Sequence, residues 1–380
     1  LSQLLPRIDA ASGVSNIDST TYNYRPGKME GQYQGYNYSV TLRQPVYNGS
    51  SWSSLAAAGA NTRSVEAAAL LSRQELLGRV AEASLTALRY RAAADYAAGE
   101  VLRAEELVVY AEVSLRLGAM DVINRNELKA RLDEARSLAV KSLNESKMAE
   151  QDLAIIAGVP TGSLKLPANL SAKLPSSGNY ATAEAWLAVA ETANPSIIQA
   201  REALEAAASE VDAARRGHWP TLDMSGGYAV SKGSTFLPEV ETRQWSVGVN
   251  LNLPIFAGFG PSARADRARA SRLEKEFALQ GVRDDVRRKI ETAFFSLDSA
   301  AAVIAAVSQR LNSEKEYLAS VEKGMILGVR ARTDRLAAMR RLASAERDMT
   351  EAGLEGRVAW LRLRSAAGLL KEEDLFELGQ

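Results

Sequence analysis

The sequence contains no cysteine and a single histidine, His218, among its 380 residues. The lack of cysteine excludes disulfides, thiolate metal sites and thiol nucleophiles. One imidazole is too few for a histidine metal cluster and provides no catalytic triad partner. We therefore expect no catalytic, cofactor or metal site, and interpret His218 as a polar residue at a helix-to-strand junction.

Net charge is also lacking, because 46 Lys and Arg balance 46 Asp and Glu. No basic field exists to attract nucleic acid, so that partner is excluded. The most apolar run, around residues 300–307, is much shorter than the roughly 18 to 20 apolar residues of a membrane helix, and the sequence predicts no such helix. Residues 1–6 lack the basic start and apolar core of a signal peptide, so we expect any export signal to have been removed.

An internal repeat organises the chain. Short segments around Pro6 and Pro45 recur around Pro220 and Pro254. Two further landmarks recur at a separation of 210 residues: Leu117-Gly118 as Leu327-Gly328, and Ala157-Gly158 as Ala367-Gly368. The preserved order indicates a duplicated unit. We divide the chain into a first repeat (1–160), an inter-repeat equatorial segment with a helix (161–219) and a second repeat (220–380).

Each repeat contains a long stretch without proline, between Pro45 and Pro160 and after Pro261. Apolar residues at helical spacing predict a helical hairpin in each, over about 50–157 and 260–368. The first arm would be a rod of roughly 100 Å at about 1.5 Å per residue. The turns fall at residues 118–126 and 328–334. We expect the first to be about two residues longer, because Gly118 to Leu128 spans ten steps and Gly328 to Leu336 spans eight.

The remaining segments read as four strands, over about 7–17, 36–46, 220–231 and 244–254. Residues 245–253 alternate strictly between large apolar and small or polar side chains, which is the pattern of a sheet with one apolar face. Such a sheet belongs either on a soluble core or in a transmembrane barrel. Four strands cannot close around a lumen and open edges are not tolerated in lipid, so the barrel would require several copies of the chain.

Aromatic residues lie in or beside these strands, as in the interfacial belts of membrane barrels. A soluble sheet would also bury tyrosines, so this alternative stays open. The residues that we assign to the membrane interface are Tyr36, Tyr38, Tyr47, Trp219, Tyr228, Trp245 and Phe256.

Several motifs resemble those of the TolC family of outer-membrane efflux proteins, over essentially the whole chain. Asn194-Pro195-Ser196 with the Ala-rich stretch before residues 217–223 is similar to the family's entry into a barrel strand. The segments that resemble its strand exit, second hairpin turn and closing signature are residues 253–258, Gly324 to Arg330 with Asp334 and Leu336, and residues 365–368 with 373–375.

The resemblance implies a mostly α-helical fold with a transmembrane β part. Three copies would form a homotrimer in the bacterial cell outer membrane, with a twelve-stranded barrel in contact with outer-membrane lipid and an α-barrel tunnel that extends into the periplasm. The implied partners are a periplasmic adaptor (membrane fusion protein) and an inner-membrane pump of the ABC or RND type. The second repeat is preceded by a helical segment from near Thr182 and nothing comparable precedes Pro6, so we expect a corresponding N-terminal helix that this sequence does not include.

By the same resemblance, the periplasmic gate and constriction contain Arg330, Asp334, Asn126 and Met325. Arg330 stands at the position of the gate arginine and Asp334 at that of a constriction acid. Met325 replaces the family's gate tyrosine, and Asn126 replaces an acidic partner on the first hairpin. The alternative for Arg330 and Asp334 is an exposed charge pair at a helix end, of little energetic weight.

The sequence thus predicts a passive conduit of a tripartite exporter. The segment Leu42-Arg43-Gln44-Pro45-Val46-Tyr47 looks more like the type I protein-secretion branch than the drug-efflux branch. A multidrug efflux channel is the first alternative, and a non-conducting coiled-coil envelope spacer is an alternative of another class.

Overall fold

The computed structural model describes residues 2–22, 28–163, 182–233 and 240–377. They form two compact units, and each unit combines segments from both halves of the chain. Unit 1 comprises Leu1–Val65 and Gln199–Gln280, and unit 2 comprises Glu66–Ile198 and Gly281–Gln380. These units are spatial, whereas the two repeats are units of sequence, so the division into repeats stays a prediction.

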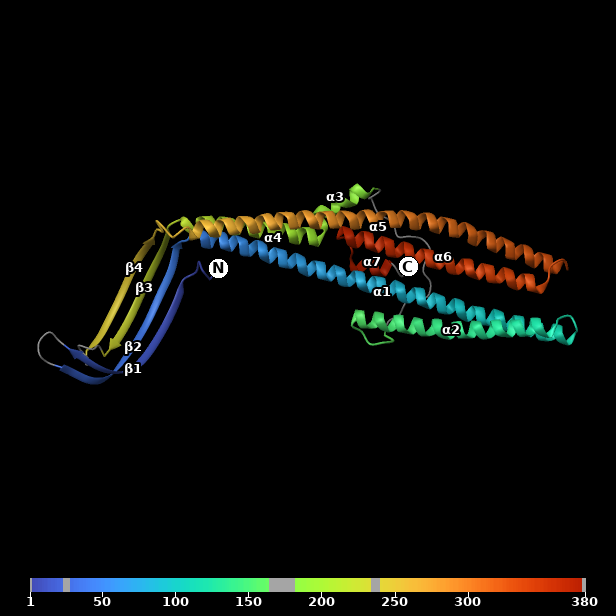
Figure 1. The fold of residues 1–380 in the computed structure, drawn as a ribbon, viewed down its shortest axis with the longest axis horizontal. Helices are drawn as coiled ribbons and strands as arrows, with labels where there is room; N and C mark the ends of the chain where they lie inside the picture. The colour runs from blue at the N-terminus through green and yellow to red at the C-terminus, as the bar shows by residue number, and fades with distance from the viewer. Residues whose placement is uncertain (1, 23–27, 164–181, 234–239, 378–380) are drawn as a thin grey trace. The chain divides into compact units, whose positions relative to one another are not determined.

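Unit 1 contains one antiparallel sheet, with the strands in the order β1-β2-β3-β4 (Figure 1). The strands are β1 (Arg7–Tyr22), β2 (Lys28–Tyr47), β3 (Thr221–Lys232) and β4 (Glu241–Asn252). The two strands of each repeat form a hairpin, and β2 and β3 join the two hairpins edge to edge. The predicted four strands are thus confirmed.

The first hairpin is longer than the sequence pattern indicates. β1 and β2 pair as far as Tyr22 with Lys28, whereas β3 joins β2 only from Tyr36 onward. Residues 28–35 of β2 and the segment of β1 that pairs with them therefore form a two-stranded ribbon that β3 does not join. Its residues do not alternate between apolar and polar, which is why a periodicity argument ended the first strand near residue 17 and began the second near residue 36.

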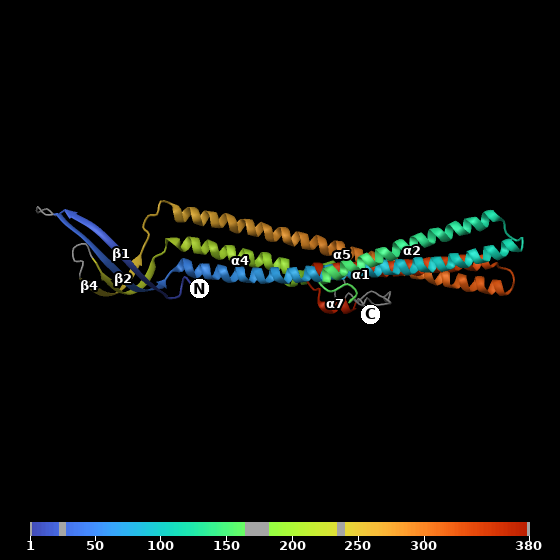
Figure 2. The same ribbon diagram turned by 90° about the horizontal axis from the view of Figure 1, so that it is seen from below.

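Four helices form the two hairpins: α1 (Gly49–Arg116, 68 residues), α2 (Val122–Ala157, 36 residues), α5 (Gly260–Ile326, 67 residues) and α6 (Arg332–Ala367, 36 residues). Within unit 2 they run side by side (Figure 2). The predicted long hairpins are confirmed. Shorter helices follow the first repeat and the second hairpin: α3 (Ala183–Ala193), α4 (Pro195–Arg215), the 3-10 turn η1 (Arg216–His218) and α7 (Glu372–Glu377).

The two hairpin turns have equal length, and the expectation of a longer first turn was wrong. Residues 117–121 separate α1 from α2, and residues 327–331 separate α5 from α6. Leu128 and Leu336 are not equivalent landmarks, because a separation of 210 pairs Leu128 with Ala338. Gly118 and Gly328 end the long arms in the left-handed conformation, with φ of 72° and 75°, where glycine is least strained.

The main apolar cluster of unit 2 lies between α1 and α6. Its buried members are Ala81, Leu85, Leu88, Leu354, Trp360, Leu361 and Leu370. Asn194 of the inter-repeat segment packs against the end of this region: its amide nitrogen donates to the Ala366 carbonyl (2.7 Å), and its side-chain oxygen accepts from the Ser196 N–H (2.9 Å). The C-terminal end of α6 is thereby fixed against the start of α4.

In the described part of the chain, one helix is long and apolar enough to cross a membrane by length and composition alone. An 18-residue window of α5 has a mean hydropathy of 1.6, and 11% of it is buried. Counting unbroken apolar runs missed this window because small and polar residues interrupt it. Phe295 and Val303 are among its helix's exposed apolar side chains.

Candidate functional site

Two backbone hydrogen bonds in the turn of the second hairpin end on the same residue of α5. The Gly324 carbonyl accepts from the N–H groups of Val329 (2.9 Å) and Arg330 (3.2 Å). A Cβ on Gly324 would come within 2.7 Å of the Arg330 side chain, so glycine permits this close return. Arg330 is therefore positioned by the turn itself.

Arg330 and Asp334 lie together, as the sequence suggested. Their side chains form an ion pair of 3.8 Å (Nη1 to Oδ2) with 53% and 41% of the side chains exposed. Asp334 also accepts a hydrogen bond from the Ala331 N–H (3.2 Å) at the N-terminus of α6, where a carboxylate is favoured. The carboxylate of Asp334 thus both caps a helix and faces a cation.

Neither Asn126 nor Met325 takes part in the ion pair between Arg330 and Asp334. Asn126 is exposed in the first turns of α2, and Met325 is half-buried in the last turn of α5. Within the ranges that the structure describes, no hydrogen bond joins Asn126 to Arg330 or Asp334. The N-terminus of α2 is capped instead by Asp121, whose side chain accepts from the Asn124 N–H (2.7 Å).

Sequence reasoning missed a contact between the two hairpins at this end. Arg332, in the first turn of α6, donates to Glu106 of α1 (2.8 Å). Arg335 likewise pairs with Glu322 across the second hairpin (3.2 Å). Opposite charges were visible in the sequence, but their partners are separated by 226 and 13 residues, so only the packing of the helices identifies them.

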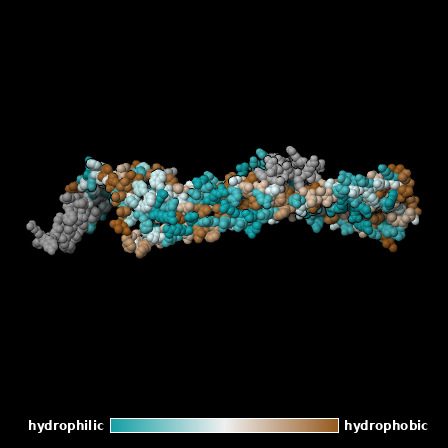
Figure 3. Space-filling view, turned by 90° about the horizontal axis from the view of Figure 1, so that it is seen from above, coloured by the Kyte–Doolittle hydropathy of each residue, from teal (hydrophilic) through white to brown (hydrophobic). Residues whose placement is uncertain are grey.

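Both turns also expose large apolar side chains. Hydrophobic surface gathers at the end of unit 2 that carries the hairpin turns (Figure 3). Isolated exposed apolar residues are common, but a patch of this kind marks a surface that contacts another molecule. Its members are Leu117, Val122, Ile123, Ile326, Leu327 and Val329.

The sheet of unit 1 presents an apolar face to its surroundings. Paired residues share a face, so the register places Val40, Tyr228 and Trp245 in one row. On the same face Val247, Val249 and Leu251 are 71%, 67% and 66% exposed, so they do not pack into a core of their own chain. An exposed apolar face of this extent matches lipid rather than water.

Five of the seven predicted interface aromatics lie on that face: Tyr36, Tyr38, Tyr47, Tyr228 and Trp245. The rings of Tyr36 and Tyr38 are 5.5 Å apart, and the Tyr36 hydroxyl donates to Glu241 (2.6 Å). The other two lie outside the strands. Trp219 stacks under the guanidinium of Arg216 (5.3 Å), and Phe256 packs edge-on against Phe259 (5.8 Å).

The described residues include no group of three or more His, Asp and Glu side chains arranged to hold a metal ion. Arg357 of α6 is a buried cation: it is 2% exposed, and its Nε has no hydrogen-bond partner among the described residues. Burial lowers the pKa of Arg357 from its ordinary value. Nothing in its surroundings suggests a reaction.

Comparisons with known proteins agree with this geometry. The family model described as "Outer membrane efflux protein" matches residues 186–369. Outer membrane protein TolC of Vibrio cholerae is 24% identical over 99% of this chain and 85% of its own length. The alkaline protease secretion protein AprF of Pseudomonas aeruginosa is 27% identical over 98% of this chain and 78% of its own length.

The fold recurs in a solved structure, the outer membrane protein VceC of Vibrio cholerae. The TM-score is 0.75 at 17% identity, and the match covers 95% of this chain and 87% of VceC. Fold, exposed strand face and relatives define a non-enzymatic efflux channel of the outer membrane that reaches into the periplasm. In sequence and in fold the chain is similar, over nearly its whole length, to the TolC family of outer membrane efflux proteins.

Proposed function

We propose that three copies of the chain assemble into a homotrimeric channel-tunnel with a twelve-stranded barrel and an α-helical tunnel. The observation that carries this proposal is the sheet: β1 and β4 are its edge strands, with no strand paired to their outer edges among the described residues, and the exposed face is apolar. In lipid every backbone group must be paired, so β4 of one copy is expected to pair with β1 of the next. The exposed apolar window of α5 is available for contacts between copies.

The trimer serves as the passive conduit of a tripartite exporter, which is the kind of assembly that the family implies. A periplasmic adaptor would bind it and an inner-membrane ABC or RND-type pump would supply the energy. The proposed role requires no chemical reaction at any residue of the chain. Specificity for cargo would therefore depend mainly on the pump.

The cargo that we propose is protein, exported by type I secretion. A relative that aligns with nearly the whole chain is named as an alkaline protease secretion protein, and this supports the choice. The alternative is multidrug efflux. Deletion of the gene, followed by analysis of the secreted proteins and of drug susceptibility, separates the two. We expect loss of at least one secreted protein with unchanged drug susceptibility, and the reverse result would establish the efflux role.

A conductance experiment separates a conduit from a non-conducting spacer. We expect the purified protein to form channels in planar bilayers and Arg330→Ala to open them more often, because the variant removes a charged contact at the turn. Glu127→Ala is a suitable control, because it removes an ion pair within α2 that does not involve the second hairpin. If neither variant conducts ions in planar bilayers, the non-conducting spacer is favoured.

We further propose that Arg330, Asp334, Asn126 and Met325 line the periplasmic constriction in the trimer. Asp334→Asn keeps an acceptor for the Ala331 N–H while it removes the charge. A ring of three carboxylates dominates the field of a narrow pore, so this variant should lower the preference for cations. Unchanged reversal potentials in a salt gradient would place Asp334 outside the constriction.

A further inference from the structure

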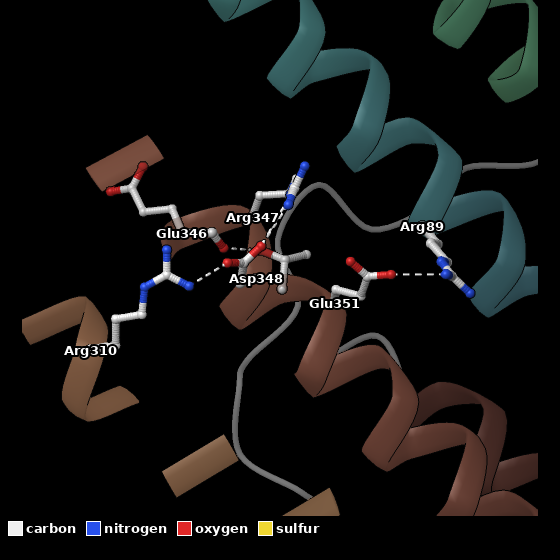
Figure 4. A network of polar contacts seen from close by, with 7 residues as sticks. Arg89, Arg310, Glu346, Arg347, Asp348 and Glu351 are labelled. Carbon is white, nitrogen blue, oxygen red and sulfur yellow. Dashed lines mark hydrogen bonds and ion pairs between the residues drawn. The ribbon is translucent and has the colours of Figure 1, made fainter. Parts of the chain in front are cut away.

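A polar network joins three helices at a point away from both hairpin turns (Figure 4). Asp348 of α6 accepts hydrogen bonds from Arg310 of α5 (2.7 Å) and from its neighbour Arg347 (2.8 Å). Only 23% of the Asp348 side chain is exposed, and most other carboxylates in the ion pairs between helices are more exposed. Charge-assisted bonds to one partly buried carboxylate are the strong kind.

Tyr96 brings α1 into the same network. The guanidinium of Arg347 lies over the Tyr96 ring at 5.2 Å, and that of Arg103 lies at 5.8 Å. Burial, followed by the nearby charge of Glu100, raises the pKa of Tyr96, so its hydroxyl stays protonated. Tyr96, Arg310, Arg347 and Asp348 are called the Asp348 node below.

The node lies within a ladder of ion pairs between α1 and α6. As the residue numbers rise along α1 they fall along α6, so the two helices are antiparallel neighbours although they belong to different repeats. Each exposed pair by itself contributes little. The carboxylates of Glu82, Glu351 and Glu106 are more exposed than that of Asp348, whereas Glu100, one helical turn from Tyr96, is as shielded as Asp348 and also pairs with two arginines. The pairs are Glu82–Arg362 (2.8 Å), Arg89–Glu351 (2.8 Å), Glu100–Arg340 (3.7 Å) and Glu106–Arg332 (2.8 Å).

The node also marks the end of the main apolar cluster. That cluster includes no residue of α1 beyond Leu88 and no residue of α6 before Leu354. From the node to the turns, α1, α5 and α6 are held chiefly by exposed pairs and scattered buried side chains, and the turns themselves expose apolar residues. Regions with fewer buried contacts open more easily.

We propose that the Asp348 node is the fulcrum of gating: α1, α5 and α6 stay joined there while their turn-proximal arms move apart. Asp348 is a positioning residue, since it acts on the constriction only through the helices that it holds. The inference rests on the proposed gated channel. The proposal concerns how the helical arms are held together, so amide hydrogen exchange can test it without a conductance measurement.

The first test compares Asp348→Asn with Asp133→Asn. Asp133 is an exposed α2 residue in an ion pair of 3.8 Å within its own helix. In the full-length trimer in detergent, Asp348→Asn should speed amide hydrogen exchange of residues 332–347 about tenfold and leave residues 353–367 unchanged, because only the arm is released. It should also raise the frequency of channel opening. Exchange that matches Asp133→Asn would overturn the proposal.

The second test separates a fulcrum from a latch that must break. Because the chain contains no cysteine, Arg310→Cys with Asp348→Cys creates the only two thiols, and a flexible bis-maleimide can join them. With Arg330→Ala in the same chain, linked channels should still open. Linked channels that stay closed would overturn the fulcrum. If Arg330→Ala alone forms no channel, the conduit proposal fails, and the exchange comparison still decides whether the node holds the arms.

Discussion

The short helices of the two hairpins end in the same way but in different surroundings. Gly158 after α2 and Gly368 after α6 are both left-handed caps, with φ of 68° and 77°. A Cβ at Gly158 would meet nothing within 4 Å. At Gly368 it would lie 2.6 Å from the Asn194 Cα and 2.7 Å from the Ala193 carbonyl oxygen. The same turn is therefore free in one repeat and enclosed in the other.

Burial along the helices shows the same asymmetry. Both contain 36 residues, but six residues of α2 are buried, whereas thirteen residues of α6 are buried, Trp360 among them. Helix length and caps are local properties, and duplication preserved them. Packing depends on neighbours, and α3, which packs on α6, belongs to the inter-repeat segment. Equivalent positions in the two repeats should therefore respond differently to mutation.

The largest expected difference is at the caps. Gly368→Ala combines left-handed strain with a backbone overlap and should lower the free energy of unfolding by about 2–4 kcal/mol. Gly158→Ala should cost about 1 kcal/mol, because it adds strain alone. Urea unfolding in detergent, followed by circular dichroism, measures both. Equal losses would mean that the contact between Gly368 and Asn194 has no energetic role.

The next difference concerns a buried cation. Arg357 is 2% exposed, and its equivalent 210 residues earlier, Lys147, is exposed. Arg357→Met fills the same space without a buried charge and should raise the free energy of unfolding by about 1–2 kcal/mol. Lys147→Met should change it by less than about 0.5 kcal/mol. Destabilisation by Arg357→Met would reveal a partner for the guanidinium in the assembled protein.

A smaller difference is expected at the hairpin turns. Asp121 caps α2 with its side chain, whereas Ala331 at the start of α6 has no side-chain acceptor. Asp121→Ala should cost about 1 kcal/mol, and Ala331→Ser should add about 0.5 kcal/mol. Thermal melting of the two variants, with Asp121→Asn as the conservative control, checks the pair. A melting temperature of Asp121→Ala equal to that of Asp121→Asn would show that the cap is not needed.

The smallest effect is expected in the response to acid. Burial would raise the pKa of Asp348, but hydrogen bonds from Arg347 and Arg310 outweigh it and the pKa is lowered. The stabilisation is therefore present above the ordinary aspartate pKa and is lost as the pH falls through the lowered value. Leu138, the equivalent in α2, has no charge to lose. Asp348→Asn should flatten the dependence of the unfolding midpoint on pH below about 4. An unaltered slope would assign the acid response to other carboxylates.

Sequence alone was sufficient for the features that depend on local chemistry. The landmarks Gly118, Gly158, Gly328 and Gly368 located the helix ends, and the alternation at residues 245–253 located the exposed strand face. The β1–β2 ribbon was missed because no apolar face marks it. The ladder between α1 and α6 was missed for another reason. It joins helices of different repeats, and the sequence of either repeat alone does not determine which helices pack against each other.

The row in which Tyr36 pairs with Lys232, and Lys232 with Glu241, is the last one in which four strands hydrogen-bond together. Past it, the only strand pairing described for residues 28–35 is with β1, so their N–H and C=O groups on the other side would need water or another partner. Hydrocarbon cannot supply such bonds, so the oily layer must stop at or before this row. In the proposed barrel the outer margin of the bilayer would therefore coincide with the end of four-stranded pairing, and the ribbon beyond it would lie in water.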